Sequence, residues 1–519
     1  MTTVNADAEQ RASIVRDVLE SHLPDGIGMS AGASTRRGRG DSVELRDPTT
    51  DHLVTTWADL SEDLASEAVE QAVRAQRAWW AMGPRRRGEV LRAVGQLIRS
   101  KAQDLALLET LTTGKPVRDT RAELGAIDHM FTIYAGWAER INGETLGVEP
   151  SWHTYTRLEP YGVVVALTPW NAPLLTACAN ALPALAAGNA VVVKPSEITP
   201  ASTIRLAGLF HEAGAPVGLL TAAPGLGPTV GRALTAHPAV GKVVFIGSVG
   251  TGRAVAAAAA GSGTPTILEL GGKSANVVFA DADLTAAAGG ALSAVFSGAG
   301  QSCQAGSRLL VHETIHDALV EKIRSGARRL RVGDPLDPDT ELGPIIHRAQ
   351  LDRVRALVDA GVAHGARRLD QLAVPTDIAD GPLRDGNWYM PTLLDGVGPD
   401  HPLNGTEIFG PVLCIDTFAD EEEALAKANG TEFGLAGAVW TSDVARAHRF
   451  AAGCDAGTIY VNCYKVGHPL APFGGFKSSG WGRASGRGVV EEFVQSKVVW
   501  LPTEALPAPF PSLAADPIP

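Results

Sequence analysis

The most constraining feature of this sequence is a regular alternation of short apolar segments and helical patterns between residues 160 and 270. Residues 163–167 are a continuous run of β-branched and apolar side chains, as expected for a strand buried on both faces. Strands and helices that alternate at this spacing favour a parallel, doubly wound sheet. The predicted strands are 163–167, 190–193, 219–222, 243–246 and 266–270, and the predicted helices are 174–187, 201–213, 229–236 and 253–260.

A second α/β pattern runs from residue 276 to about residue 461. Because 519 residues exceed what one hydrophobic core usually serves, we expect at least two domains. Residues 57–140 are predicted to be mainly helical, 143–157 to be an extended excursion, and 489–501 to end in a strand. In the second pattern the predicted strands are 276–279, 307–311, 412–418 and 458–461, and the predicted helices are 316–329, 348–364 and 421–428.

The composition of the chain excludes several classes of binding partner. A net charge of −12 disfavours nucleic acid, because phosphate backbones require clustered Lys and Arg. No apolar run approaches the roughly 20 residues of a membrane span, and residues 1–10 do not resemble a secretory signal. Five cysteines without metal-ligand spacing predict neither a disulfide framework nor a zinc site. We therefore expect a cytoplasmic protein with no nucleic-acid, membrane or metal partner.

Two motifs follow predicted strands of the first sheet. Gly247 and Ser248 lie in a glycine-rich turn between a strand and a helix, where backbone N–H groups can face a phosphate. The order is not G-x-G-x-x-G, so a plain tight turn explains it equally well. Lys194 and Glu197 follow the second strand, and carboxyl ends of parallel strands are where ligands bind. A surface ion pair is the alternative for these two residues.

Three residues suggest chemistry at a carbonyl carbon. Cys303 is surrounded by small and polar residues, which suits an accessible thiol, whereas the other four cysteines sit in apolar or strand contexts. Glu269 lies 34 residues earlier and supplies a carboxylate that can activate water. Asn171 follows the first strand, where its amide could donate to an oxyanion or simply form a turn.

Seven short motifs occur in one order along the chain: PWN at 169–171, KPSE at 194–197, GS at 247–248, ELGGK at 269–273, GQSC at 300–303, EIFGP at 407–411 and PFGG at 472–475. Together they resemble the NAD(P)-dependent aldehyde dehydrogenase superfamily. The resemblance runs from about residue 45 to residue 501, and the motifs together are far more specific than any one alone. It implies two doubly wound, Rossmann-like parallel-sheet domains and a small β oligomerisation arm.

The resemblance also implies a role for each catalytic candidate. The Cys303 thiolate would attack the aldehyde carbon, and the Asn171 side chain with the Cys303 backbone N–H would hold the oxyanion. Hydride transfer would leave a thioester, which water activated by Glu269 would hydrolyse to the carboxylic acid.

The remaining motif residues would bind the cofactor. Lys194 and Glu197 would hold the adenosine ribose, and the Glu197 carboxylate favours NAD over NADP because it repels a 2′-phosphate. Ser248 would lie by the pyrophosphate, and Glu407 and Phe409 would hold the nicotinamide end. The resemblance assigns Trp170, Gly227 and Gly247 to the same cofactor site.

The resemblance predicts the domain organisation and a homodimer or homotetramer. We expect an N-terminal extension at 1–40, an NAD-binding domain at 41–139 and 158–270, and a catalytic domain at 271–487. An oligomerisation arm would comprise 140–157 and 488–502, followed by a Pro-rich, disordered or extended tail at 503–519.

The sequence departs from the family pattern at two places. Ala484 stands where many relatives carry a second proton-relay glutamate, so the base role falls on Glu269. Small residues replace tunnel aromatics, which suggests a bulky or functionalised aldehyde whose polar group could meet Lys465 or His468, unless Leu174, Leu175 or a shifted loop fills the space. The predicted tunnel residues are Ala172, Thr176, Ala179, Ser297, Gly467 and Phe473.

Three other functions remain open at this stage. A CoA-acylating relative needs no water-activating carboxylate, so Glu269 argues against it. A non-catalytic family member has no use for Cys303, Glu269, Asn171 and Glu407 together. A cysteine hydrolase that works without NAD is weaker still, since no His motif pairs with Cys303.

Overall fold

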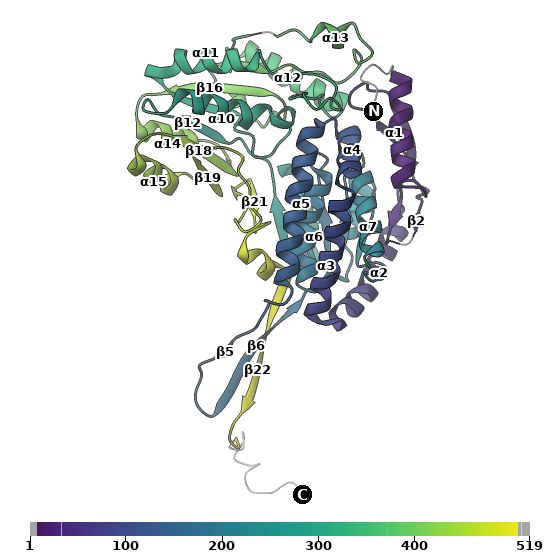
Figure 1. Cartoon of the computed structure of the whole chain (residues 1–519). Helices are drawn as coiled ribbons and strands as arrows, with labels where there is room; N and C mark the ends of the chain where they lie inside the picture. Colours follow the sequence, from purple (N-terminus) through teal and green to yellow (C-terminus); the bar gives the residue numbers. More distant parts are fainter. Residues whose placement is uncertain (1–7, 33, 371, 507–509, 511–519) are drawn as a thin grey trace, which may run out of the picture.

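The structure, a computed structural model, describes residues 8–32, 34–370, 372–506 and 510. These residues form two large sheets with helices packed against them, and a three-stranded ribbon projects from the body (Figure 1). This arrangement confirms the predicted α/β class with two parallel sheets. Most of the predicted Pro-rich tail, residues 507–509 and 511–519, lies outside the described residues.

The first sheet has eight strands, and its five central strands, in the order β9-β8-β7-β10-β11, are parallel. All residues of β7 and β8 are buried, which explains the continuous apolar runs that predict them. The chain winds outward from β7 in one direction and from β10 in the other, so ligands are expected at the carboxyl ends between these two strands. The strands are β1 Met29–Ser30, β2 Thr35–Arg36, β7 Val163–Leu167, β8 Ala190–Lys194, β9 Leu220–Ala222, β10 Val240–Ile246, β11 Thr266–Glu269 and β21 Gly480–Trp481.

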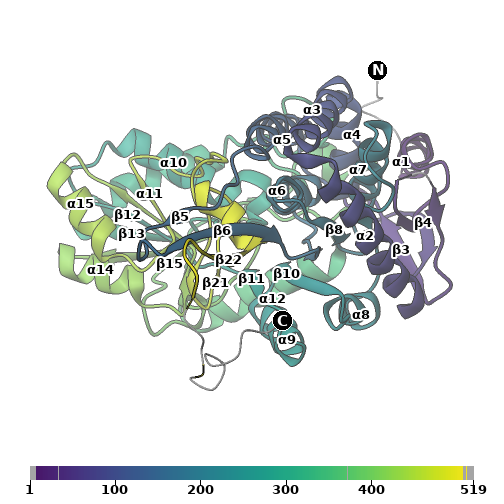
Figure 2. The same cartoon turned by 90° about the horizontal axis from the view of Figure 1, so that it is seen from below.

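Helices cover both faces of the first sheet. In Figure 2, α5 and α6 lie on one side of β8 and β10, whereas α8 and α9 lie on the other. The predicted helix 229–236 differs in detail: it begins as a single π-helical turn, Gly227–Gly231, with a proline in its first turn, and continues as α8. The helices are α2 Glu62–Ala81, α3 Gly83–Ser100, α4 Ala102–Thr113, α5 Val117–Trp137, α6 Pro173–Ala186, α7 Ala201–Glu212, α8 Arg232–Thr235 and α9 Val249–Gly261.

The second sheet repeats the doubly wound plan. Six of its seven strands are parallel, in the order β15-β16-β13-β12-β18-β19, and β14 is antiparallel at one edge. All four predicted strands are present, and β14, β15 and β18 are additional. The strands are β12 Ala275–Val278, β13 Arg308–His312, β14 Arg367–Arg368, β15 Thr392–Asp395, β16 Val412–Phe418, β18 Ala436–Trp440 and β19 Thr458–Val461. The helices are α10 Leu284–Phe296, α11 His316–Ala327, α12 Arg348–Ala363, α13 Thr376–Ala379, α14 Glu421–Asn429 and α15 Val444–Gly453.

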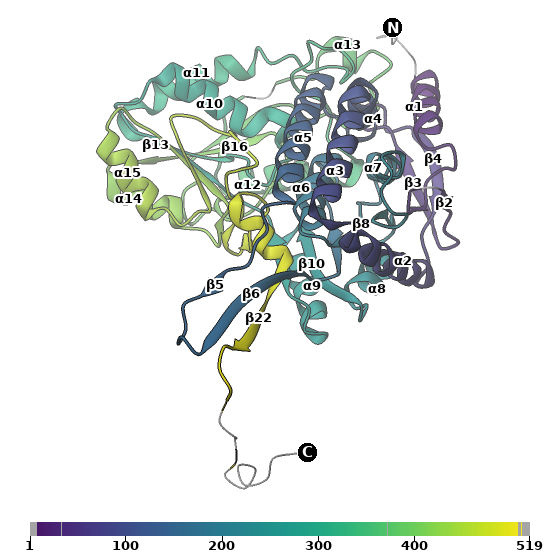
Figure 3. The same ribbon diagram turned by 60° about the horizontal axis from the view of Figure 1, so that its bottom comes forward.

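The projecting ribbon joins two distant parts of the chain. β22, Val494–Pro502, pairs antiparallel with β6, Trp152–Pro160, which pairs with β5, Thr145–Leu146 (Figure 3). This confirms the predicted extended excursion and the strand near the end of the chain. Two strand pairs complete the β structure, β3 Ser42–Arg46 with β4 Leu53–Ala58 and β17 Phe433–Gly434 with β20 Phe476–Lys477.

The N-terminal segment is part of the folded body. It forms helix α1, Ala8–His22, and strands β1 and β2, which extend the first sheet beside β9. Arg11 on α1 is buried and pairs with Asp47 at 2.9 Å and Asp334 at 2.6 Å. Over the described range, no helix combines the length and apolarity that a membrane crossing requires.

Candidate active site

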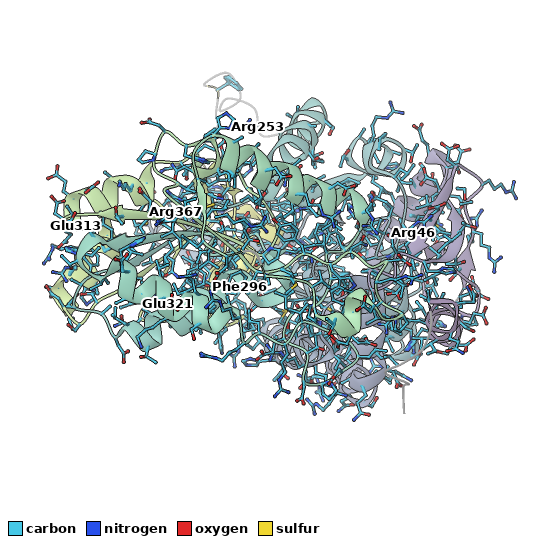
Figure 4. The ribbon with its side chains drawn as sticks, turned by 90° about the horizontal axis from the view of Figure 1, so that it is seen from above. Arg46, Arg253, Phe296, Glu313, Glu321 and Arg367 are labelled. Atoms are coloured by element: carbon cyan, nitrogen blue, oxygen red, sulfur yellow. The ribbon has the colours of Figure 1, made fainter. Side chains whose placement is uncertain are left out.

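The Cys303 loop is held in an unusual backbone conformation. Phe296, labelled in the middle of Figure 4, ends α10 and is followed by a 3₁₀ turn over Ser297–Gly300. Ala299 and Gly300 have φ angles of 54° and 70°, in the left-handed region. A Cβ on Gly300 would lie 2.1 Å from the carbonyl oxygen of Gly410, so only glycine lets these two loops touch.

Asn171, directly after β7, reaches the same loop. Its Nδ2 atom donates a hydrogen bond of 2.9 Å to the backbone carbonyl of Gln301. The Gln301 side chain is fixed in turn, because its Oε1 atom accepts a hydrogen bond of 3.0 Å from the Ile346 amide. The structure therefore brings together Asn171 and the segment that leads into Cys303.

The electrostatic surroundings of Cys303 are dominated by two carboxylates. Burial, together with the charges of Glu269 and Glu407, raises the pKa of the Cys303 thiol to about 12. The Lys465 ammonium acts in the opposite direction and lowers the thiol pKa. Cys303, Glu269 and Glu407 thus lie close enough to influence one another, although they come from three separate parts of the chain.

Glu269 ends β11 and is 4% exposed. Neither carboxylate oxygen has a hydrogen-bond partner in the described part of the chain. Burial raises the Glu269 pKa well above its usual range, while the charge of Arg483 opposes the shift. A carboxyl group in such surroundings is suited to general acid–base chemistry.

Glu407 is fixed against the glycines that follow Glu269. Its Oε1 atom accepts a hydrogen bond of 3.0 Å from the Gly272 amide. A Cβ on Gly271 would lie 2.5 Å from Oε2 of Glu407, and one on Gly272 would lie 2.4 Å from the carbonyl oxygen of Cys303. The glycines of the ELGGK motif are therefore the contact surface for both Glu407 and Cys303.

Trp170 and Phe409 form an aromatic pair at this edge of the sheet. Their ring centroids are 5.2 Å apart in an edge-to-face arrangement, and the Phe409 φ angle is 58°. The structure thus places Trp170, next to Asn171, against the EIFGP motif. The sequence assigns both segments to cofactor binding.

The other residues predicted to bind the cofactor lie at or just after the carboxyl ends of β8, β9 and β10. Lys194 and Glu197 are an ion pair at 3.8 Å, and Lys194 is buried. Ser248 is the N-cap of α9, where its Oγ atom accepts a hydrogen bond of 3.3 Å from the Thr251 amide. Open space surrounds the Cβ position of Gly227, at the start of the π-helical turn, whereas at Gly247 that position meets the Phe245 ring at 2.6 Å.

Some of the polar groups predicted to face the substrate tunnel already form hydrogen bonds within the protein. The Thr176 hydroxyl donates to the Ala172 carbonyl at 2.8 Å, so it is used within α6. Gly467 is exposed, and a Cβ there would meet nothing within 4 Å. Lys465 donates to the Ser297 carbonyl at 3.4 Å. The amide of Ala484 donates to the Phe473 carbonyl at 2.8 Å, and this alanine supplies no second base.

Three contributors to the site escape sequence reasoning. Gln301 anchors Asn171, Arg483 acts on the Glu269 pKa, and Arg353 lowers the pKa of Glu407. Gln301 lies inside the recognised GQSC motif, so its position is a usable signal, whereas the two arginines carry none. No group of His, Cys, Asp or Glu in the described ranges is arranged to hold a metal ion.

Comparison with known proteins gives matches to aldehyde dehydrogenases. The family model for the aldehyde dehydrogenase family matches residues 35–499. A betaine aldehyde dehydrogenase from Cereibacter sphaeroides is 41% identical over 472 residues, which are 91% of this chain and 96% of that protein.

Two solved structures share the fold over nearly their whole length. PnpE from Pseudomonas sp. WBC-3, in complex with nicotinamide adenine dinucleotide, has a TM-score of 0.90 and 38% identity, covering 93% of this chain and 99% of that one. Betaine aldehyde dehydrogenase from Staphylococcus aureus, in complex with NAD⁺, has a TM-score of 0.91 and 33% identity, covering 96% and 99%. The chain belongs to the aldehyde dehydrogenase family.

Proposed function

We propose that this aldehyde dehydrogenase uses NAD to oxidise an aldehyde to its carboxylic acid, with Cys303 as nucleophile and Glu269 as the base that activates water. The observation that carries the proposal is the pairing of a half-buried thiol with a buried carboxyl group whose two oxygens have no hydrogen-bond partner among the described residues. A carboxyl group kept without partners beside a thiol is costly to bury, and it is available to a water molecule or a substrate.

The first half-reaction depends on Cys303 and Asn171. The thiolate is the attacking form, and Lys465 is a positive group of this chain that favours it. Attack on the aldehyde carbon gives a thiohemiacetal oxyanion. The second N–H of the Asn171 amide and the Cys303 backbone N–H are the donors assigned to that oxygen, since the first N–H is bound to Gln301.

The second half-reaction depends on Glu269. The carboxylate removes a proton from water, and the hydroxide attacks the thioester carbonyl carbon. The C–S bond then breaks, the carboxylic acid leaves, and the sulfur of Cys303 recovers its proton. Because Ala484 supplies no carboxylate, Glu269 is the base assigned to this step.

The residues at or just after the ends of β8, β9 and β10, together with Glu407 in the loop before β16, fit a dinucleotide. Open space at Gly227, the N-terminus of α9 at Ser248, and the Lys194–Glu197 pair suit a pyrophosphate and an adenosine ribose. Glu407, held by Gly272, would accept from the second ribose, beside the Trp170–Phe409 pair. When bound, NAD supplies the two-electron acceptor that turns the thiohemiacetal into a thioester.

The domain assignment and assembly belong to the same proposal. We assign residues 41–139 and 158–270 to cofactor binding, 271–487 to catalysis, and 140–157 with 488–502 to an oligomerisation arm. The exposed side chains of Val498, Trp500 and Leu501 on β22 support a homodimer or homotetramer. Five free cysteines support a cytoplasmic location.

The experiment is an aldehyde panel with NAD, in which NADH absorbance and acid formation are measured with and without CoA. We expect equal NADH and acid without CoA, and a requirement for CoA would favour the acylating alternative. Cys303→Ser should abolish turnover. The matched control Cys454→Ser, at a cysteine outside the proposed machinery, should retain it. Full activity in Cys303→Ser would overturn the proposal.

A further inference from the structure

Lys465 is a half-buried ammonium group beside the proposed nucleophile. Its Nζ atom donates to the Ser297 carbonyl at 3.4 Å. No acidic side chain among the described residues lies within the 4.0 Å of an ion pair from this atom. Ser297 opens the turn that leads to Cys303, so the ammonium group is tied to the loop of the nucleophile.

The segment that carries Lys465 is fixed on both sides of Cys303. The Tyr460 hydroxyl donates to Oε1 of Gln304 at 2.9 Å, directly after Cys303. The buried Tyr464 ring packs on Gly306, where a Cβ would lie 2.9 Å from the ring. Lys465 itself has a φ angle of 55°, a conformation that side chains other than glycine adopt at a cost. Its place beside Cys303 is therefore set before any substrate arrives.

Within the described ranges of the chain, Lys465 has no close acidic counter-ion. Two groups act on it electrostatically, Cys303 and Asp119. Asp119 is already paired with Arg118 at 3.2 Å, so its charge is offset by a nearer cation. Burial lowers the pKa of Lys465 to about 8, which leaves the ammonium form in the majority at neutral pH. An unpaired, partly desolvated cation of this kind is expected where an anion binds.

The surroundings of Lys465 also disfavour the binding of a cationic substrate. Betaine aldehyde carries a quaternary ammonium group, a charge that proteins recognise with cages of aromatic rings. Of the residues assigned to the tunnel, Phe473 alone has an aromatic ring, and a single ring does not make a cage. A like charge beside the aldehyde site would raise the free energy of such a substrate when it binds.

We propose that Lys465 is a specificity-determining residue that binds the carboxylate of the substrate, so that this enzyme prefers semialdehydes to the quaternary ammonium aldehyde for which its relatives are named. This inference rests on the proposed function, because Lys465 matters in this way only if Cys303 attacks the aldehyde. The carboxylate would accept from Nζ in place of the long hydrogen bond to Ser297.

The test compares kcat/KM with NAD for three classes of aldehyde: succinic, glutaric and adipic semialdehydes; butanal, pentanal and hexanal; and betaine aldehyde. For at least one chain length we expect the semialdehyde to exceed the matching alkanal by about 10- to 100-fold. Lys465→Gln should abolish this preference for the semialdehyde, whereas Lys465→Arg should retain it. Lys465 also acts on the Cys303 thiol, but that effect is shared by both aldehydes and cancels in the ratio of their kcat/KM values.

A matched control is Lys477→Gln, since Lys477 also has a left-handed φ angle of 52° and donates to a carbonyl, that of Asn429, at 2.9 Å. The ratio should not change in this variant. An unchanged ratio in Lys465→Gln, or a wild-type preference for betaine aldehyde over both other classes, would overturn the inference while leaving the proposed function intact. Failure to oxidise any aldehyde with NAD would instead overturn the proposed function.

Discussion

The side-chain amide of Asn171 donates a hydrogen bond of 2.9 Å to the backbone carbonyl of Gln301, two residues before Cys303. An Asn amide has two N–H groups, so one orients the side chain and the other remains for an oxyanion. The bond also links the end of β7 in the first sheet to the loop after α10 of the second sheet.

Replacement of Asn171 tests this double use of the amide. Asn171→Ala should lower kcat/KM about 10²- to 10³-fold, because one oxyanion donor is lost. The rate of Cys303 alkylation by iodoacetamide is measured in parallel, and we expect it to change less than tenfold, since no oxyanion forms in that reaction. Turnover within twofold of the wild type would contradict the assignment.

Glu197 is predicted to select NAD over NADP. Its carboxylate, 3.8 Å from the Lys194 ammonium, would face a 2′-phosphate with a like charge. Glu197→Gln removes that repulsion and leaves Lys194 in place, so the NADP-to-NAD ratio of kcat/KM should rise by about tenfold. Steady-state kinetics with both cofactors measure this ratio, and a ratio equal to the wild-type value would count against the role.

The contact between Gly271 and Glu407 is predicted to control cofactor binding. Gly271→Ala places a methyl group 2.5 Å from Oε2 of Glu407, and overpacking of this kind costs about 1–3 kcal/mol. NAD affinity, measured by calorimetry, should fall about tenfold or more. The control is Gly289→Ala on α10, where a Cβ meets nothing within 4 Å. Equal NAD affinity in the two variants would show that Glu407 does not depend on this contact.

Glu109 on α4 predicts a pH dependence of stability. Burial raises its pKa to about 7, against the opposing charge of Lys115. Because the folded pKa lies above the unfolded one, its contribution to stability is fully present below about pH 4.5 and is lost as pH rises through 7, by about 3 kcal/mol. Glu109→Gln should therefore unfold at a higher urea concentration than the wild type at pH 8 and not at pH 5. The same difference at both pH values would refute this explanation.

The central strands and most of their helices follow from the sequence because burial leaves a local signature. The strands at 163–167 and 190–193 are continuous apolar runs because helices cover both faces of the sheet. The N-terminal helix leaves no comparable signature. Its buried Arg11 is satisfied by Asp47 and Asp334, which are 36 and 323 residues away in the chain.

The sequence names the residues of the candidate site but not the contacts between them. Cys303, Glu269 and Asn171 stand in recognisable motifs, so they can be named from sequence. The buried Glu269 carboxylate, the Gly271–Glu407 contact and the position of the Lys465 ammonium depend on which loops meet in three dimensions. The spacing of residues along the chain does not show which loops come into contact.

The most direct test of the account is a single-turnover experiment on Glu269→Gln, in which aldehyde and NAD are mixed with the enzyme and both NADH and intact protein mass are followed. We expect a burst of about one NADH per active site, slow steady turnover, and a mass increase equal to the acyl group that is absent in the Cys303→Ser,Glu269→Gln double variant. Steady turnover at the wild-type rate with no acyl adduct would contradict the assignment of Glu269 to thioester hydrolysis.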